Sequence, residues 1–371
     1  MPPETASPDP APPDRAVPEG PSPARPSPPA PPTAGRSAAR PGPAAAVPPV
    51  PPGPVAPRGG VAAPAVGSVP VAADAPAWFR RALAVPFTDG WVTVDGARIH
   101  YLGWGERGRR GVLFVHGGAA HAHWWTHVAA TFARDLRVVA IDLSGHGDSD
   151  HRAAYSLAQW TDEVVVVAAD AGIAGPPVIV GHSMGGFVTI ATAARYADRL
   201  AGAVVCDSPV ARPDPEVSAA QGGSAFGRPR VYPTLDDALS RFRTVPPQAH
   251  YLDYVMHHVA RRSVERVAGG WQWKFDGAVF DPFTGGNMRE GALSYLPEVR
   301  CRLALLRSEN GLVTEDIGSA MYEALGRVTP VVELPEAGHH AMLDQPLILL
   351  TALRTLLADW DHSEPHRRPD V

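Results

Sequence analysis

The sequence predicts an α/β protein with a mostly parallel central sheet flanked by helices. Short apolar, β-branched runs alternate with runs of helical length from about residue 112 to 207, and again from 302 to 359. This alternation favours parallel strands with helices on both faces. It fails between residues 209 and 296, where helix-like segments rich in aromatic residues occur instead.

The individual elements follow from the same patterns. Two runs at 91–94 and 98–102, separated by Asp95-Gly96, are typical of a hairpin that opens the sheet. The later strands are expected at 112–116, 137–142, 177–182, 201–207, 302–308 and 330–334, and the helices at 122–133, 157–171, 184–197, 315–326 and 346–359.

The most specific motif is Gly181-His182-Ser183-Met184-Gly185, which lies between an expected strand and an expected helix. In that context, Gly-x-Ser-x-Gly places a nucleophilic serine on a tight turn. A side chain at either glycine would collide with the neighbouring strand and helix. Ser183 is therefore the predicted nucleophile.

A serine hydroxyl needs a base to become a good nucleophile at neutral pH. His339 is the predicted base, because it follows a strand-like run, precedes a helix and comes late in the chain, after the serine. The adjacent His340 is a minor alternative.

A third motif, His116-Gly117-Gly118, ends the strand at 112–116. Backbone amides on such a loop, together with the amide after the nucleophile, can bind a developing oxyanion. The predicted donors are Gly118 and Met184, with Ala119 as an alternative to Gly118. His116 is expected to shape the loop rather than contact a substrate.

With these motifs in this order, the chain resembles the α/β-hydrolase fold superfamily, in particular its esterase-like members with a helical cap. Residues 142–149 are similar to the family's Asp-x-x-Gly-x-Gly-x-Ser segment, in which Asp142 and Asp148 would shape the loop. The resemblance covers roughly residues 88–360. It implies a core at 78–209 and 298–360, with a helical cap at 210–297 inserted after strand 6.

The acid that would orient the histidine is the point where the chain departs from the family. Most members carry it in a turn after the seventh strand, and here Gly311 occupies that position. Asp207, at the end of the sixth strand, and Glu309, in the seventh-strand turn, are the two alternatives, because either carboxylate could fix the tautomer of the base. Asp207 is preferred because some members place their acid there. Asp316, or no acid at all, is a lesser possibility.

The aromatic residues of the 210–297 segment suggest an apolar pocket over the strand ends, where open α/β sheets bind ligands. Most of these aromatics are expected to form the segment's own small core. The predicted pocket residues are Trp124, Trp125, Trp271 and Trp273.

No metal and no cofactor are expected. The clustered histidines at 121, 123, 127, 257 and 258 have no carboxylate at a recognised ligand spacing. Cys206 and Cys301 are not expected to bond, because they would lie toward opposite ends of neighbouring strands.

Composition adds several expectations. About 25 of the 42 prolines precede Ala77, so the segment 1–77 is expected to be disordered, and the polar tail 361–371 to be flexible. A net charge of −5 gives no electrostatic reason to expect nucleic acid. The chain has no secretory pattern and no apolar run of membrane-spanning length, so a cytoplasmic location is expected.

Together these features predict a serine hydrolase that acts through an acyl-enzyme on a small hydrophobic carboxylic ester. The nucleophile is a serine, whereas the epoxide hydrolases and haloalkane dehalogenases of the family use an aspartate. A serine would form a stable ether with an alkyl substrate, and water would find no carbonyl to attack, so these two activities are not expected. The same residues could also support a C–C bond hydrolase, a cofactor-free perhydrolase or a lyase. An alternative of another class is a non-catalytic binding module with a Pro-rich docking tail. The oligomeric state stays open.

Overall fold

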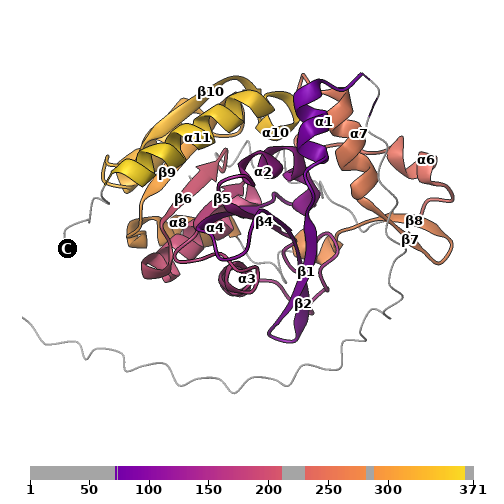
Figure 1. The fold of residues 1–371 in the computed structure, drawn as a ribbon, viewed down its shortest axis with the longest axis horizontal. Helices are drawn as coiled ribbons and strands as arrows, with labels where there is room; N and C mark the ends of the chain where they lie inside the picture. Colours follow the sequence, from indigo (N-terminus) through magenta and orange to yellow (C-terminus); the bar gives the residue numbers. More distant parts are fainter. Residues whose placement is uncertain (1–71, 73, 211–229, 281–287, 364–371) are drawn as a thin grey trace, which may run out of the picture. The chain divides into compact units, whose positions relative to one another are not determined.

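A computed structural model describes residues 72, 74–210, 230–280 and 288–363 (Figure 1). Eight strands form one sheet in the order β1-β2-β4-β3-β5-β6-β9-β10, and β7 and β8 form a separate hairpin. β2 pairs antiparallel with both β1 and β4, whereas the neighbours from β4 to β10 are parallel. The predicted mostly parallel sheet is confirmed.

The bounds of the elements follow the predicted order. The strands are β1 (Thr88–Val94), β2 (Ala97–Trp104), β3 (Gly111–Val115), β4 (Arg137–Ile141), β5 (Val178–His182), β6 (Gly202–Cys206), β7 (Val264–Val267), β8 (Gly270–Trp273), β9 (Leu303–Asn310) and β10 (Val331–Gly338). The α-helices are α1 (Ala77–Leu83), α2 (Thr126–Ala129), α3 (Leu157–Asp170), α4 (Met184–Arg195), α6 (Leu235–Leu239), α7 (Asp253–Arg262), α8 (Met288–Tyr295), α9 (Glu315–Ala324), α10 (Ala341–Asp344) and α11 (Pro346–His362).

The sheet separates two apolar cores, and the alternation of side chains along each central strand explains why. In β3, Leu113 and Val115 belong to the core beneath α3, α4, α8 and α9, whereas Val112 and Phe114 belong to the core beneath α1, α2, α10 and α11. Successive side chains of a strand point to opposite faces. A strand that is apolar at every position therefore needs helices on both sides, as Figure 1 shows.

The expected helix at 122–133 is instead three short turns: η1 (Ala122–Trp124), α2 and η2 (Ala130–Phe132). All residues from 121 to 130 are buried. Contacts with other parts of the chain hold these turns, since the amide of Ala122 donates to the Asp142 carboxylate and the ring of His127 bonds to the carbonyl of Met342. The structure also adds a helix that was not predicted, α1, and Ala75 just before it is buried, so the ordered core begins before residue 78.

The described parts of the expected helical cap, 230–280 and 288–297, are not wholly helical. Besides α6 and α7 they contain the β7–β8 hairpin, whose two-residue turn ends with Gly269 at positive φ. The last helix, α8, packs against α4 and contributes Ala292 to the core below the sheet. Most of 1–77, residues 211–229 and 281–287, and residues 364–371 of the expected tail lie outside the described residues.

Within the described ranges, no helix is both long enough and apolar enough to cross a bilayer.

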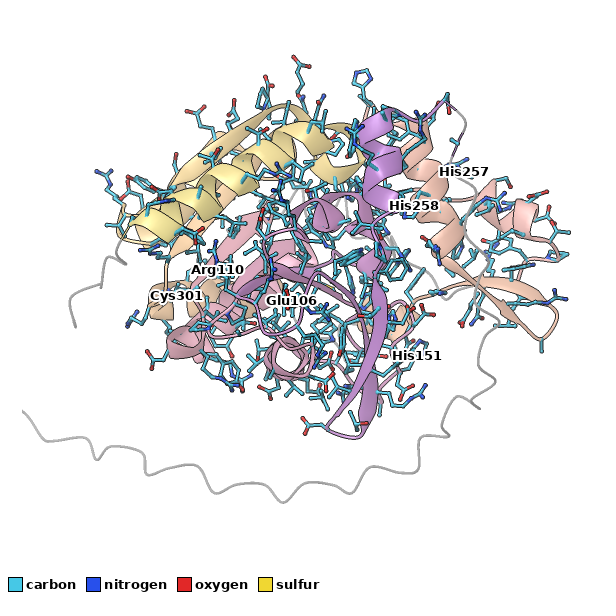
Figure 2. All side chains as sticks on the ribbon, in the orientation of Figure 1. Glu106, Arg110, His151, His257, His258 and Cys301 are labelled. Atoms are coloured by element: carbon cyan, nitrogen blue, oxygen red, sulfur yellow. The ribbon has the colours of Figure 1, made fainter. Side chains whose placement is uncertain are left out.

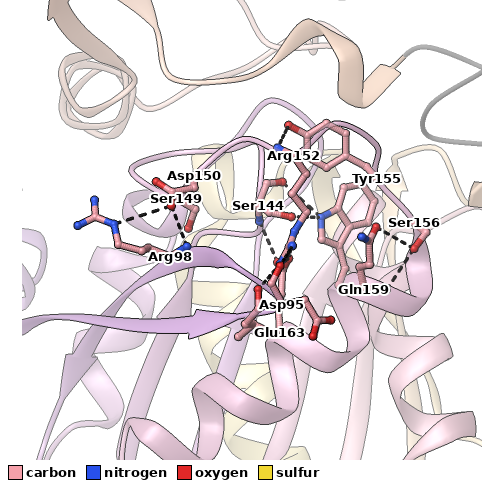
Figure 3. A network of polar contacts seen from close by, with 12 residues as sticks. Asp95, Arg98, Ser144, Ser149, Asp150, Arg152, Tyr155, Ser156, Gln159 and Glu163 are labelled. Carbon is pink, nitrogen blue, oxygen red and sulfur yellow. Dashed lines mark hydrogen bonds and ion pairs between the residues drawn. The ribbon is translucent and has the colours of Figure 1, made fainter. Parts of the chain in front are cut away.

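A buried ion pair fixes the loop that follows β4 to α3 (Figure 3). The Glu163 carboxylate is fully buried and accepts hydrogen bonds from Nε and Nη2 of Arg152, at 3.0 and 2.9 Å, and from the amide of Ser144 at 2.9 Å. Arg152 also donates to the carbonyl oxygens of Val94 and Asp95 at the end of β1. The loop is thus held between a strand and a helix.

We expect Glu163→Gln to lower the free energy of unfolding by about 3 kcal/mol, because it leaves the buried Arg152 guanidinium without its counter-charge. Urea denaturation measures this. Glu106→Gln (Figure 2) is the matched control. Its ion pair with Arg109 is exposed and should contribute less than about 1 kcal/mol. Equal losses in the two variants would contradict a structural role for the buried pair.

Candidate active site

Ser183 lies on the tight turn between β5 and α4. Its backbone is in an uncommon region, with φ 53° and ψ −120°, and its amide donates to the carbonyl of Cys206 at 3.0 Å. Gly185 lies against the backbone of Val115 and His116, where no side chain fits, and Gly181 is equally confined. The close approach expected at both glycines is therefore present, and it leaves the Ser183 hydroxyl partly exposed.

His339 follows the last residue of β10, and its ring lies next to Ser183. The distance from Nε2 to the Ser183 Oγ is 3.1 Å, and the distance from Nδ1 to Oδ2 of Asp207 is 2.6 Å. Because an ionised carboxylate can only accept, Nδ1 carries the proton and Nε2 is free to accept from the hydroxyl. The structure thus brings together the predicted nucleophile, the predicted base and the preferred acid.

Asp207 reaches His339 from the end of β6, with β9 lying between β6 and β10. Its carboxylate accepts the amides of Leu312 at 2.8 Å, Val313 at 3.2 Å and Ser308 at 3.3 Å. The turn after β9, where the family usually carries its acid, here supplies hydrogen-bond donors to an acid from the neighbouring strand.

Gly311 is the residue that makes this arrangement possible. A methyl group at position 311 would overlap the carboxylate of Asp207. Glu309, the alternative acid, is exposed and accepts the amide of Glu336 at 2.7 Å, away from His339. Asp316 is hydrogen-bonded to Thr314. Neither of these carboxylates is placed to orient the imidazole.

The His-Gly-Gly loop lies beside the serine, as predicted. A carbon added to Gly117 would be 3.3 Å from the Cβ of Ser183, and one added to Gly118 would be 3.9 Å from the sulfur of Met184. His116 shapes the loop, since its Nδ1 donates to the Gly117 carbonyl at 2.7 Å and its Nε2 accepts the amide of Leu143 at 3.1 Å. Burial lowers the pKa of His116, which keeps the ring neutral for both roles.

Asp142 holds the chain that continues from this loop. Its buried carboxylate accepts the amides of Ala122 at 2.6 Å and Asp148 at 2.9 Å, and contacts Nδ1 of His100 at 2.8 Å. Burial alone would lower the pKa of His100, but hydrogen bonds to Asp142 and Asp89 outweigh it and raise the pKa to about 9. A charged pair therefore anchors the loop. The role of Asp142 was expected from the sequence, whereas that of His100 was not.

The segment inserted after β6 contacts the site at two places. Phe280 lies over the loop, so that a carbon added to Gly118 would be 3.0 Å from its ring. Gln248 accepts the amide of His340 at 2.9 Å, and the Pro246 carbonyl lies 3.2 Å from Nε2 of the same histidine. Sequence reasoning missed these contacts, because no local pattern reports which residues of an insertion face the sheet.

The four predicted pocket tryptophans have different environments. Trp124 is buried beside His340, with ring centroids 5.4 Å apart. Trp273 is half-buried and its ring contacts that of Phe242. Trp271 pairs through its backbone with Tyr232. Both tryptophans belong to β8, and their contacts are with other residues of the inserted segment. The prediction for Trp125 is wrong: its side chain has no exposed surface and packs on Phe114 in the core, at 4.9 Å.

Three of the clustered histidines, whose spacing gave no reason to expect a metal, each have a hydrogen-bond partner of their own. His121 is hydrogen-bonded to Ser263, His123 to Thr126 and His127 to the carbonyl of Met342. Two other groups in the described ranges bring three possible ligand atoms within 4.8 Å of one another: His182, His339 and His340, and His100, Asp142 and Asp148. Cys206, the last residue of β6, and Cys301, two residues before β9, are both free.

Comparison with known proteins establishes the family. The model of the alpha/beta hydrolase family matches residues 112–352, which is more than half of the chain. The chain therefore belongs to the alpha/beta hydrolase family.

Several proteins that are similar to this chain are named as esterases, lipases or hydrolases. The chain is 28% identical over 271 residues to Esterase Rv0045c of Mycobacterium tuberculosis, covering 71% of this chain and 88% of that protein. It is 38% identical over 111 residues to a monoacylglycerol lipase of Mycolicibacterium smegmatis, covering 28% of this chain and 40% of the lipase. The solved structure of E-2-(acetamidomethylene)succinate hydrolase has a TM-score of 0.64 at 20% identity, covering 74% of this chain and all of that one, and shares the fold. The protein is a hydrolase with the α/β-hydrolase fold.

We expect Gly311→Ala to reduce activity by at least tenfold while lowering stability only modestly, because the added methyl displaces the Asp207 carboxylate from His339. Gly318→Ala is the matched control, since a methyl there meets its neighbours only at ordinary van der Waals distances, 3.5 Å or more. The measurements are kcat on an ester substrate and the thermal unfolding midpoint. Full activity in Gly311→Ala would contradict the confinement of Asp207.

Proposed function

We propose that the protein is a serine hydrolase that cleaves a small hydrophobic carboxylic ester through an acyl-enzyme. The observation that carries this proposal is the continuous hydrogen-bonded line from the Ser183 hydroxyl through His339 to Asp207, with distances of 3.1 and 2.6 Å. Such a line can move a proton away from the hydroxyl while it attacks a carbonyl carbon.

The proposed reaction uses each group in turn. His339 Nε2 takes the proton of Ser183 as the oxygen attacks, and returns it to the departing alcohol. Asp207 holds the ring and stabilises the imidazolium that forms in between. Water then attacks the acyl-enzyme and gives a proton to His339, which passes it to the Ser183 oxygen as the carboxylic acid leaves. The amides of Gly118 and Met184 are the proposed donors to the oxyanion in both steps.

The surroundings of the site support an apolar substrate. Phe280 covers the Gly118 loop and Trp124 lies beside His340, so the acyl or alcohol group would meet aromatic surface. An apolar, water-poor site also strengthens the hydrogen bonds to a developing charge. The esterase and lipase names of the relatives agree with this substrate class.

The same catalytic residues could support C–C bond hydrolysis, cofactor-free perhydrolysis or a lyase reaction. These alternatives share the nucleophile and the base, so the choice depends on substrate tests. The non-catalytic alternative relied on a Pro-rich docking tail, which lies outside the described residues. The aligned side chains of Ser183, His339 and Asp207 favour the enzyme.

We expect a fluorophosphonate probe to label the protein at Ser183, and labelling to disappear in Ser183→Ala. Hydrolysis of p-nitrophenyl esters should fall by roughly 10⁴-fold or more in the same variant, and a series of graded acyl chains should show a preferred length. Ser208→Ala, a change at the neighbouring strand end, is the control and should keep the labelling. A native protein that is never labelled would support the binding module instead.

A further inference from the structure

Three histidine rings meet at the proposed base. His182, His339 and His340 are each at most 4% exposed, and one nitrogen of each lies within 4.8 Å of the other two. The ring centroid of His339 is 4.7 Å from that of His182 and 4.6 Å from that of His340. His182 and His339 are 157 residues apart in the chain, so no motif spacing reveals this group.

Each ring keeps a nitrogen lone pair. Nε2 of His182 donates to the carbonyl of His339 and Nε2 of His340 to that of Pro246, which leaves Nδ1 unprotonated in both. Nδ1 of His340 is buried and has no hydrogen-bond partner among the described residues. The neutral imidazole, with one unprotonated nitrogen, is the form that ligates metals.

The remaining groups match a transition-metal site. A metal-bound histidine usually donates its other ring N–H to a carboxylate, which orients the ring and raises its basicity. His339 makes this contact with Asp207. The Ser183 hydroxyl, 3.1 Å from Nε2 of the same ring, adds an oxygen beside three imidazole nitrogens. Zn²⁺ and Cu²⁺ favour imidazole ligands, whereas Mg²⁺ and Ca²⁺ favour oxygen ligands alone.

The second group of possible ligands, His100, Asp142 and Asp148, is already occupied by ion pairs within the chain. The carboxylate of Asp148 is paired with the ammonium of Lys274 at 2.6 Å, and Asp142 is paired with the protonated His100. Cations of the chain itself already neutralise both carboxylates.

We propose that His182, His339 and His340 form an inhibitory site for a divalent transition metal such as Zn²⁺ or Cu²⁺. Both nitrogens of His339 are engaged, one with Ser183 and the other with Asp207. Coordination through either nitrogen therefore removes one contact that the reaction needs. The loss of activity rests on the proposed function, whereas metal binding does not.

The geometry also predicts selectivity among metals. Tetrahedral zinc with bonds of about 2.0–2.1 Å places its ligand nitrogens roughly 3.4 Å apart. The three rings must therefore move closer than their present separation of up to 4.8 Å. Since this movement opposes binding, the metal should be exchangeable and removed by chelators. Cu²⁺ should inhibit more strongly than Ni²⁺ or Co²⁺, in the Irving–Williams order.

The test uses the whole chain and two independent readouts. Zn²⁺ binding is measured by competition with a chromophoric chelator, and inhibition is measured on a p-nitrophenyl ester, with EDTA reversal. We expect His340→Phe to weaken Zn²⁺ binding at least tenfold and, when inhibition is expressed relative to the variant's own metal-free rate, to raise the Zn²⁺ concentration for half-inhibition by a similar factor. His340→Gln, which retains a donor toward Pro246, serves as a second variant in case the larger change impairs folding.

Matched controls exclude other metal ligands on the chain. His257 lies on α7 and Cys301 precedes β9 (Figure 2), and His257→Ala and Cys301→Ser should leave Zn²⁺ binding and inhibition unchanged. Unchanged binding in both His340 variants would overturn the site, as would equal inhibition by Mg²⁺ or Ca²⁺. Zn²⁺ binding that requires His340 in a protein without ester hydrolysis would uphold the metal site and reject the proposed function.

Discussion

The hydrogen bond between Asp207 and His339 is the contact on which the proposed chemistry depends, and it is built by three adjacent strands. β6 supplies the carboxylate, β10 supplies the imidazole, and the turn after β9, the strand between them, supplies the amides of Leu312 and Val313. The carboxylate thus has several donors in a buried setting, where an unpaired charge would be costly. Gly311 provides the space in that turn. The position of the Asp207 carboxylate therefore depends on the conformation of the turn after β9.

The site also concentrates backbone strain. Ser183, Asp207 and Ala119 all have positive φ, at 53°, 43° and 55°, and are three of the six non-glycine residues with this property in the described ranges. Such conformations cost about 1–3 kcal/mol each and persist where surrounding structure fixes them. Here the fixing groups are the buried sheet below and the pair of His100 and Asp142 beside the loop. In these conformations the Ser183 hydroxyl and the Asp207 carboxylate both reach His339.

The sequence allowed the fold class, the nucleophile, the base and the His-Gly-Gly loop to be predicted, because each has a local pattern beside a strand end. The choice between Asp207 and Glu309 was harder, since it depends on which of two neighbouring turns faces His339. Gly311 was itself a signal, because a glycine where the acid is expected leaves room for one from the next strand. The burial of Trp125 and the position of Phe280 follow from long-range packing, which no short motif encodes.

The most direct test of this account compares kcat for ester hydrolysis in Asp207→Asn and Glu309→Gln. Asparagine keeps the shape of the acid but can no longer fix the Nδ1–H tautomer of His339, so we expect a loss on the order of 10³–10⁴. Glu309→Gln changes an exposed group that accepts only the Glu336 amide, and should keep nearly full kcat. Comparable small losses in both variants, or a larger loss in Glu309→Gln, would contradict the assignment of Asp207.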